Sequence, residues 1–349
     1  MRTRLIYSIV CLCLPAFVAG SLLASCTKVV PDDSFARQSD LIGFNTAMTK
    51  AAVGYPISSK FISTAYSISS TLSWDNATAR AGATTLIDQE EVSYVSESNS
   101  WRTAAAHYWD ANYKFTFFSY SPSSLKSTKV SVSTDGVAIS DWDVETDATE
   151  ILVADIAQDK TKNESYGSVT VYTGVPTNFR QKLSKLSFKM GVSSYAEAGT
   201  KVTLLDIQIA DVCTRGNYAR GGYTNDAWTV VEASRKTGTG VFSVFSGSQK
   251  LSTETNFVPA SKLIIPQSLL ASGSVHPTLI VKYQIQVGEG AVETKTAKCH
   301  FDINLRQEAW EKGKEYTYTI HIGVGQYPIE FDGAVNDWSA VSDQEINIG

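Results

Sequence analysis

Short segments in which apolar and polar residues alternate recur along the chain, and they constrain its fold more than any other feature. The strictest is residues 279–287, where every second residue is apolar. A period of two is typical of a β-strand that buries one face and exposes the other. No amphipathic helix longer than about three turns is evident. The pattern predicts an all-β chain of β-sandwiches, with strands at residues 41–48, 60–68, 113–120, 129–133, 151–154, 169–172, 183–192, 202–209, 294–305 and 316–322.

Two intervals lack a clear strand pattern. Residues 74–102 are predicted to be loop-like with a brief strand at 92–95, and residues 213–262 to form only short pieces, because glycine, serine and threonine are frequent there. A polar, charged interval at 158–165 is the predicted domain boundary. It divides the chain into an N-terminal β-sandwich at 41–165 and a C-terminal β-sandwich at 166–349.

The N-terminus has the features of an export signal. Arg2 and Arg4 precede an apolar run at residues 5–18, which is too short to span a bilayer as a helix. Residues 22–26 read Leu-Leu-Ala-Ser-Cys, which resembles the bacterial lipobox, in which the cysteine is acylated and the upstream peptide is removed. The alternative is an ordinary signal peptide that happens to carry a cysteine. We therefore expect a signal peptide at 1–25, a mature N-terminus at Cys26, and a tether at 26–40 anchored in the outer membrane by several acyl chains.

Charge and cysteine usage narrow the function further. The chain has a formal net charge of −5, and loss of Arg2 and Arg4 with the signal takes it from −5 to −7. An acidic chain without basic blocks excludes nucleic acid as a partner. Cys213 and Cys299 are the cysteines left after processing and lipidation. Either a disulfide or two buried free thiols would fit an oxidising compartment.

A search for catalytic motifs finds none. The chain has no G-x-S-x-G, H-E-x-x-H or C-x-x-C pattern. We therefore expect no enzymatic activity and no cofactor. Metal binding is not expected either. Cys299 and His300 are adjacent in a predicted strand, so their side chains leave opposite faces and cannot bind one ion together. The other histidines, His107, His276 and His321, sit in unrelated segments without ligand spacing.

Two groups of residues leave alternatives open. Asp141, Asp143 and Glu145 lie at a period of two and would suit either a calcium site or a solvated strand edge. Five tryptophans would either stack on sugars or pack in the core; they are Trp74, Trp101, Trp109, Trp142 and Trp228.

Several stretches, in this order, resemble the fimbrillin family, the subunits of type V pili in Gram-negative anaerobes. Each is weak alone, but together with the lipobox they cover nearly all of the mature chain. They are residues 42–44 followed by Thr-Lys-Ala at 49–51, 113–122, 183–188, Ile-Ile-Pro-Gln at 264–267, 310–320 and 329–338.

The resemblance implies two transthyretin-like β-sandwiches and assembly by donor-strand exchange. A trypsin-like protease cuts a lipoprotein precursor behind its first strand, which here carries Ile42 and Phe44. The strand leaves, and the C-terminal segment of another subunit fills the groove. Loss of a strand exposes unpaired backbone groups and an apolar trough, and an alternating donor strand satisfies both.

The expected cleavage site departs from the family pattern. The family has Thr-Arg-Ala where this chain has Lys50 between Thr49 and Ala51. A cut after Arg37 would remove the lipid without opening the groove, and a cut after Arg80 would remove two strands. Lys50, Arg37 and Arg80 are all candidate processing positions.

The candidate donor segment is the tail, with apolar residues at Ile329, Phe331, Ile346 and Ile348. The resemblance implies a structural or adhesive fimbrial subunit at the cell surface. Its partners would be other pilin subunits, outer-membrane lipid bound through Cys26, a trypsin-like protease, and a host or bacterial surface ligand. Two alternatives are an anchor subunit that retains its first strand and a non-polymerising lipoprotein that binds a glycan or another ligand.

Overall fold

The computed structural model describes residues 40–48, 55–126, 129–162, 174–193, 199–221, 225–253, 257–323 and 329–338. These residues belong to one compact unit, Asp40–Gly349. Within the described ranges, no helix is long and apolar enough to cross a membrane. Some of the residues that the sequence singles out lie outside the described ranges: Cys26, Arg37, Lys50, Ile346 and Ile348, together with the predicted strand at 169–172.

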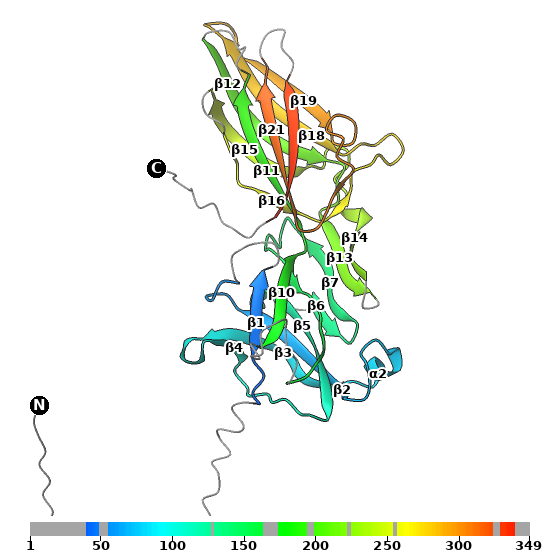
Figure 1. The fold of residues 1–349 in the computed structure, drawn as a ribbon. Helices are drawn as coiled ribbons and strands as arrows, with labels where there is room; N and C mark the ends of the chain where they lie inside the picture. Colours follow the sequence, from blue (N-terminus) through cyan, green and yellow to red (C-terminus); the bar gives the residue numbers. More distant parts are fainter. Residues whose placement is uncertain are drawn as a thin grey trace, which may run out of the picture. The chain divides into compact units, whose positions relative to one another are not determined.

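The described chain is almost entirely β-structure, as predicted (Figure 1). The strands up to residue 181 are β1 (Phe44–Met48), β2 (Phe61–Ser69), β3 (Thr84–Val95), β4 (Ser100–Thr103), β5 (Tyr113–Ser121), β6 (Val130–Ser133), β7 (Gly136–Asp143), β8 (Leu152–Ala154), β9 (Ala157–Lys160) and β10 (Val175–Gln181). Those that follow are β11 (Ser184–Val192), β12 (Thr200–Ala210), β13 (Arg215–Gly221), β14 (Asn225–Val230), β15 (Phe242–Leu251), β16 (Lys262–Ile264), β17 (Gln267–Ser268), β18 (Thr278–Val287), β19 (Glu293–His300), β20 (Ala309–Trp310), β21 (Lys314–Ile322) and β22 (Glu330–Asp337). The helical segments are α2 (Ala77–Ala81) and the 3₁₀ turns η1 (Ser96–Ser98), η2 (Ser123–Leu125) and η3 (Glu232–Ser234).

The first strand, β1, lies in the middle of the largest sheet. The order of that sheet is β2-β3-β4-β1-β10-β8-β5-β9, and β2 also pairs with β5. This additional pairing closes seven of the strands into a ring in which β1 joins β4 to β10. Removing β1 would therefore open the ring and would not merely shorten an edge.

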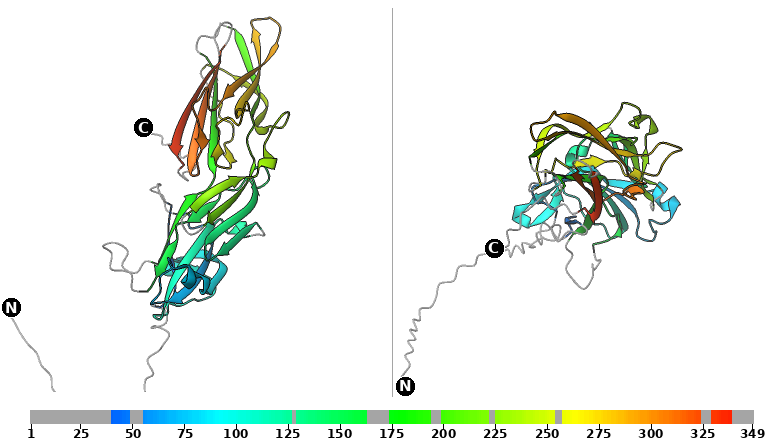
Figure 2. Two further views of the ribbon diagram at one scale, coloured as in Figure 1. Left: turned by 90° about the vertical axis from the view of Figure 1, so that its right-hand side faces the viewer. Right: turned by 90° about the horizontal axis from the view of Figure 1, so that it is seen from above.

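Three four-stranded sheets complete the fold, with the orders β16-β11-β21-β22, β15-β12-β18-β19 and β14-β13-β7-β6, alongside the small sheet β17-β20. Figure 2 shows the first two as separate layers. Their inward residues, such as Phe188, Tyr318, Leu204 and Val281, share one core. A second core, inside the ring that contains β1, is rich in aromatic side chains. The pairings β1–β10 and β7–β13 join strands from both sides of residue 165, and the boundary proposed there stays a prediction.

Three predictions of local structure were wrong. Residues 74–102 are not mainly loop, because α2 and the twelve-residue strand β3 lie there. Apolar and polar residues do not alternate along β3, because it carries the acidic run around Gln89. The φ of Gln89 is +47°, and the pairing of β3 with β2 shifts register. Asn76 starts α2 by accepting hydrogen bonds from the backbone N–H groups of Thr78 and Ala79.

The strand predicted at 294–305 ends earlier, at His300. The chain turns there because Asn304 N–H donates to the His300 carbonyl (2.9 Å), and Asn304 Oδ1 accepts from His300 N–H (2.7 Å). Phe301 is buried, whereas Ile303 is exposed and does not share its face. The region 213–262 also holds the ten-residue strand β15, where only short pieces were predicted.

Candidate functional site: the first-strand groove

The side chains of the first strand fill the aromatic core. Phe44 is 2% exposed and makes edge-to-face contacts with Phe61 and Phe117, at centroid distances of 5.6 and 5.8 Å. Ile42, two residues earlier, is also 2% exposed and belongs to the same cluster. β1 itself begins at Phe44, three residues later than the predicted strand. We call the space that residues 42–48 occupy between β4 and β10 the first-strand groove.

Backbone hydrogen bonds hold this segment on both sides. β1 pairs in parallel with β10 over five residues, but with β4 only where Phe44 lies opposite Trp101. Before β1, Ile42 N–H donates to the His107 carbonyl (2.8 Å), and Val175 N–H donates to the Gly43 carbonyl (2.7 Å). Loss of the segment would leave these groups without partners in a largely apolar trough, which is costly unless another strand pairs with them.

Gly174 shows how closely the backbone of β1 approaches its neighbour. This glycine has a φ of +108°, a conformation that side chains rarely allow. A Cβ atom at this position would lie 2.7 Å from the carbonyl carbon of Phe44 and 3.0 Å from the nitrogen of Asn45. Glycine at position 174 therefore makes room, at the start of β10, for the main chain of the strand that occupies the groove.

The residues that flank the first strand are anchored separately. On the N-terminal side, Asp40 forms an ion pair with Lys162, and its carbonyl accepts a hydrogen bond from Trp109 N–H (2.8 Å). On the C-terminal side, Tyr55 is buried, and its hydroxyl lies 2.5 Å from Ser121 Oγ and donates to the Lys60 carbonyl (3.0 Å). The hydrogen-bond partners Ser121 and Lys60 lie outside β1, so these bonds do not require an intact chain between Met48 and Tyr55.

The candidate donor residues in the described tail lie in and next to β22. This strand forms the edge of its sheet and pairs antiparallel with β21. Most of its side chains are exposed, while Ile329 and Phe331 are partly buried against the larger core. At its end Trp338 is buried, and its N–H donates to the Gly313 carbonyl (3.0 Å). β22 is thus a lightly packed edge strand, whereas β1 is deeply buried.

Residues 329–335 repeat the side-chain pattern of the first strand. Residues 42–48 read Ile-Gly-Phe-Asn-Thr-Ala-Met, and residues 329–335 read Ile-Glu-Phe-Asp-Gly-Ala-Val. The isoleucine, phenylalanine and alanine are identical at the same spacing, asparagine is replaced by aspartate, and methionine by valine. The match is visible in the sequence only when the two segments are aligned with each other.

Arg80, the third candidate processing position, is held by the fold. It lies in α2, and its guanidinium donates to the carbonyls of Trp74 (2.7 Å) and Asp75 (3.1 Å). Only 15% of its side chain is exposed. A protease needs an extended, accessible segment around the bond that it cuts, so the folded chain protects this position.

The structure also decides between the open alternatives for the other candidate residues. Asp141 pairs with Arg215, and Glu145 with Lys236, which fits a solvated strand edge. Cys213 and Cys299 are buried free thiols, not a disulfide. Burial raises the pKa of both thiols, that of Cys299 to about 11. Four of the five tryptophans are buried in the cores, and Trp228 is partly buried.

A buried ion pair lies where β10 passes into β11. Lys182 is 1% exposed, and its Nζ lies 2.9 Å from Asp226 Oδ2. Asp226 also accepts a hydrogen bond from the Tyr218 hydroxyl (2.6 Å) and pairs with Lys312 (3.0 Å). Burial alone would raise the pKa of Asp226, but Lys182 and the other donors together hold it below its usual value. Burial lowers the pKa of Lys182. The pair therefore acts as a structural connection between β10 and the second half of the chain.

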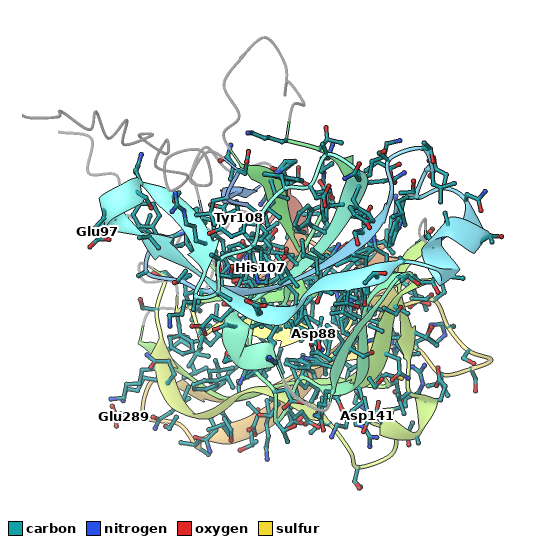
Figure 3. All side chains as sticks on the ribbon, turned by 90° about the horizontal axis from the view of Figure 1, so that it is seen from below. Asp88, Glu97, His107, Tyr108, Asp141 and Glu289 are labelled. Carbon is teal, nitrogen blue, oxygen red and sulfur yellow. The ribbon has the colours of Figure 1, made fainter. Side chains whose placement is uncertain are left out.

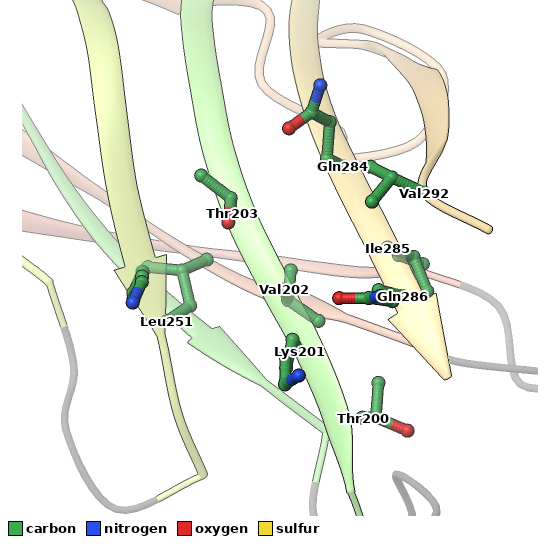
Figure 4. Close-up of a pocket in the computed structure, with 10 residues that line it drawn as sticks. Thr200, Lys201, Val202, Thr203, Leu251, Gln284, Ile285, Gln286 and Val292 are labelled. Atoms are coloured by element: carbon green, nitrogen blue, oxygen red, sulfur yellow. The ribbon is translucent and has the colours of Figure 1, made fainter. Parts of the chain in front are cut away.

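A hollow of about 470 Å³ is formed by β12, β18, the end of β15 and Val292 (Figure 4). The side chains lining it are aliphatic, amide, hydroxyl and lysine groups, and include no carboxylate, imidazole or thiol. At one end of the ring, His107 and Tyr108 lie near β3 (Figure 3), and His107 Nε2 is 2.9 Å from Glu90 Oε1.

Two histidines that are far apart in the sequence, His276 and His300, lie together in the fold. The rings of His276 and His300 lie with their centroids 5.1 Å apart. The reason is the pairing of β18 with β19, which brings residues 24 positions apart in sequence to the same end of the hairpin. Sequence spacing alone gave no signal, because the length of the hairpin and its register were not known.

These observations define a β-sandwich protein in which the buried first strand completes an aromatic core. Comparison with known proteins agrees with that class. The profile of the family described as fimbrillin-like matches residues 67–338. The chain belongs to the fimbrillin-like family. A search of curated proteins found no match.

A solved structure with a TM-score above 0.5 shows the same fold as this chain. A fimbrial protein from Bacteroides vulgatus is 16% identical, with a TM-score of 0.63, and the match covers 86% of this chain and 100% of that one. A candidate cell adhesion protein from Bacteroides uniformis is 17% identical over 86% of this chain and 99% of that one, with a TM-score of 0.47. The tip fimbrial protein Mfa3 from Porphyromonas gingivalis is 9% identical over 85% and 98%, with a TM-score of 0.35.

Proposed function

We propose that this protein is a structural or adhesive subunit of cell-surface fimbriae, exported as a lipoprotein and assembled by donor-strand exchange. The observation that carries the proposal is the match between residues 42–48 and 329–335. A segment that fills the first-strand groove and a segment at the other end of the chain present the same apolar side chains at the same spacing. One subunit can therefore supply what another has lost.

The two segments differ in how strongly their own subunit holds them. Ile42 and Phe44 are buried in a closed ring of strands, whereas β22 is an exposed edge strand. Transfer of residues 329–335 into an emptied groove would place Phe331 where Phe44 packs. Burial of such a side chain contributes on the order of 1.5–3 kcal/mol, and the new strand would also satisfy the backbone groups of β10. Exchange is then favourable once the first strand is gone.

Lys50 is the processing position that suits this mechanism. It lies in sequence between the end of β1 and Tyr55. Hydrolysis after Lys50 would separate the first strand from a chain that Tyr55 still anchors through Ser121 and Lys60. A cut after Arg37 would leave β1 attached, and Arg80 is protected by its carbonyl contacts.

The test of exchange is limited trypsin treatment of the purified precursor, followed by N-terminal sequencing and by incubation with a synthetic peptide of residues 329–338. Cleaved protein should bind the peptide and regain thermal stability, because a ligand that binds only the folded state stabilises it by mass action. A peptide with Phe331→Asp is the matched control and should bind weakly. A cut after Lys50 with no loss of stability, or equal binding of both peptides, would refute exchange.

The lipid anchor requires a separate test, because Cys26 lies outside the described residues. Cys26→Ser should abolish incorporation of labelled fatty acid and release the protein from the outer membrane. Normal labelling of this variant would show that the resemblance to a lipobox is misleading. The test does not depend on whether strands exchange.

Two alternative roles remain distinct hypotheses. An anchor subunit would retain its first strand, and the lysine at position 50 in place of the family's arginine favours that reading. A non-polymerising lipoprotein that binds glycans has less support, because most of the tryptophans are buried and cannot stack on a sugar. The N-terminus of the surface-exposed protein separates both alternatives from a polymerising subunit, since the protein would still begin ahead of β1 in either alternative.

A further inference from the structure

His276, His300 and two oxygen-bearing side chains lie on one face at the end of the β18–β19 hairpin. Thr278 is opposite His300 in the antiparallel register. The side chains of this opposed pair point to the same face of the hairpin, and His276 and Asp302, just beyond the paired strands, are placed beside it by their contacts. The cross-strand contacts agree, since His276 Nδ1 is 2.8 Å from Asp302 Oδ2 and His300 Nδ1 is 2.9 Å from Thr278 Oγ1.

The hydrogen bonds of Thr278 identify which nitrogen of His300 carries a proton. The Thr278 hydroxyl donates its single hydrogen to the His276 carbonyl, at 2.6 Å. It can therefore only accept from His300, so the proton is on Nδ1 of that ring. The Nε2 atom of neutral His300 then has a lone pair available for a ligand.

The same argument applies to His276. Asp302 is an acceptor when ionised, and its other oxygen, Oδ1, already accepts a hydrogen bond from Ile303 N–H (3.0 Å). Oδ2 therefore accepts from His276 Nδ1, which leaves Nε2 of the neutral ring with its lone pair. Histidines that bind metal ions usually donate their other N–H to a carboxylate or another oxygen in this way. Both rings thus have the tautomer of metal ligands, with Nδ1 bound to an oxygen and Nε2 bearing the lone pair.

We propose that His276 and His300 bind a borderline transition-metal ion such as Zn²⁺, Cu²⁺ or Ni²⁺ through their Nε2 atoms, with Asp302 and Thr278 as positioning residues. The observed centroid distance of 5.1 Å fits this assignment. With metal–nitrogen bonds of about 2.0–2.1 Å and a tetrahedral angle, two imidazole rings on one ion have centroids about 5 Å apart.

The donor set also defines which ions are suitable. Imidazole suits zinc, copper and nickel, whereas calcium and magnesium require oxygen ligands. Among the residues that the structure describes, no group of three or more histidine, cysteine or acidic side chains could hold an ion. The site therefore has two protein ligands, and water completes the coordination. It is independent of the first-strand groove and of the proposed exchange.

The experiment uses the mature chain with Cys26→Ser, produced without a polyhistidine tag. Isothermal titration with ZnCl₂ should show one site per chain, and MgCl₂ should show none. Electron paramagnetic resonance of a Cu²⁺-loaded sample should show coupling to two imidazole nitrogens. His276→Ala and His300→Gln should each weaken zinc binding at least about tenfold and reduce the copper signal to one nitrogen. Asp302→Asn should weaken binding by roughly 10–100-fold while both nitrogens remain coupled.

Controls separate loss of the site from loss of the fold. His107→Gln, in a histidine that pairs with Glu90, should leave zinc affinity unchanged. Every variant should keep the circular dichroism spectrum and melting temperature of the parent without metal. The proposal would be overturned if the parent protein bound no zinc when ZnCl₂ was present at 100 times the protein concentration, on the order of millimolar. A variant lacking both His276 and His300 that still gives the two-nitrogen copper spectrum would also overturn it.

Discussion

Truncation of Phe44 provides a quantitative test of how much the first strand contributes to the precursor. Phe44 is 2% exposed and packs edge to face on Phe61 and Phe117. Phe→Ala substitutions at such sites remove both burial and packing, and typically cost 3–5 kcal/mol. We therefore expect Phe44→Ala to lower the free energy of unfolding of the precursor by about 4 kcal/mol, measured by urea denaturation. The matched variant Phe331→Ala, in the partly buried β22, should cost only about 1 kcal/mol.

Proteolysis adds an internal control to this comparison. After cleavage behind Lys50 and loss of residues 42–48, parent and Phe44→Ala protein consist of the same remaining chain. Their unfolding curves should then coincide, whereas Phe331→Ala should still differ from the parent. A cost below about 1 kcal/mol for Phe44→Ala in the precursor would contradict the packing argument. A difference that persists after cleavage would show that the first strand had not left.

Three further predictions follow from other contacts. Gly174→Ala should destabilise the precursor by more than about 2 kcal/mol, because φ is +108° and the new Cβ would meet the backbone of β1; an unchanged melting temperature would contradict it. The depressed pKa of Asp226 contributes stability above about pH 4 that is lost as the pH falls. Asp226→Asn should therefore flatten the dependence of unfolding free energy on pH below pH 4. At pH 7 the same substitution should lower the unfolding free energy by about 3–5 kcal/mol, because it leaves Lys182 unpaired. In a lipid-free Cys26→Ser chain, Cys213 and Cys299 should react with Ellman's reagent only after denaturation; rapid labelling of the native protein would be inconsistent with their burial.

The ring of strands explains why assembly through a lost strand is physically reasonable for this chain. Seven strands close on one another, so the absence of β1 exposes backbone on both β4 and β10. An open edge of this kind readily accepts another strand. The proposed donor, β22, is an edge strand whose side chains are mostly exposed in its own subunit. In this proposal, a deeply buried segment near one end of the chain and an exposed edge strand near the other carry isoleucine, phenylalanine and alanine at the same spacing.

The local sequence was sufficient to predict the β-class of the fold, because alternation with a period of two reports directly which face of a strand is buried. The family was predicted from the resemblance of several stretches to fimbrillins. The local sequence also indicated Ile42 and Phe44 as neighbours on one face. Strand boundaries were less predictable. β3 carries acidic residues in its middle and is extended because β2 and β4 pair with it, which no local pattern records.

Tertiary structure decided which distant segments meet. The place of β1 between β4 and β10, the burial of Lys182 against Asp226, and the approach of His276 to His300 depend on pairings between residues far apart in the sequence. Such pairings are set by the register of whole strands, and a shift of one residue would turn every side chain to the other face. For this reason Ile42 and Phe44 were predictable from the local pattern. Their position between β4 and β10, and the approach of the two histidines, became visible only in the folded chain.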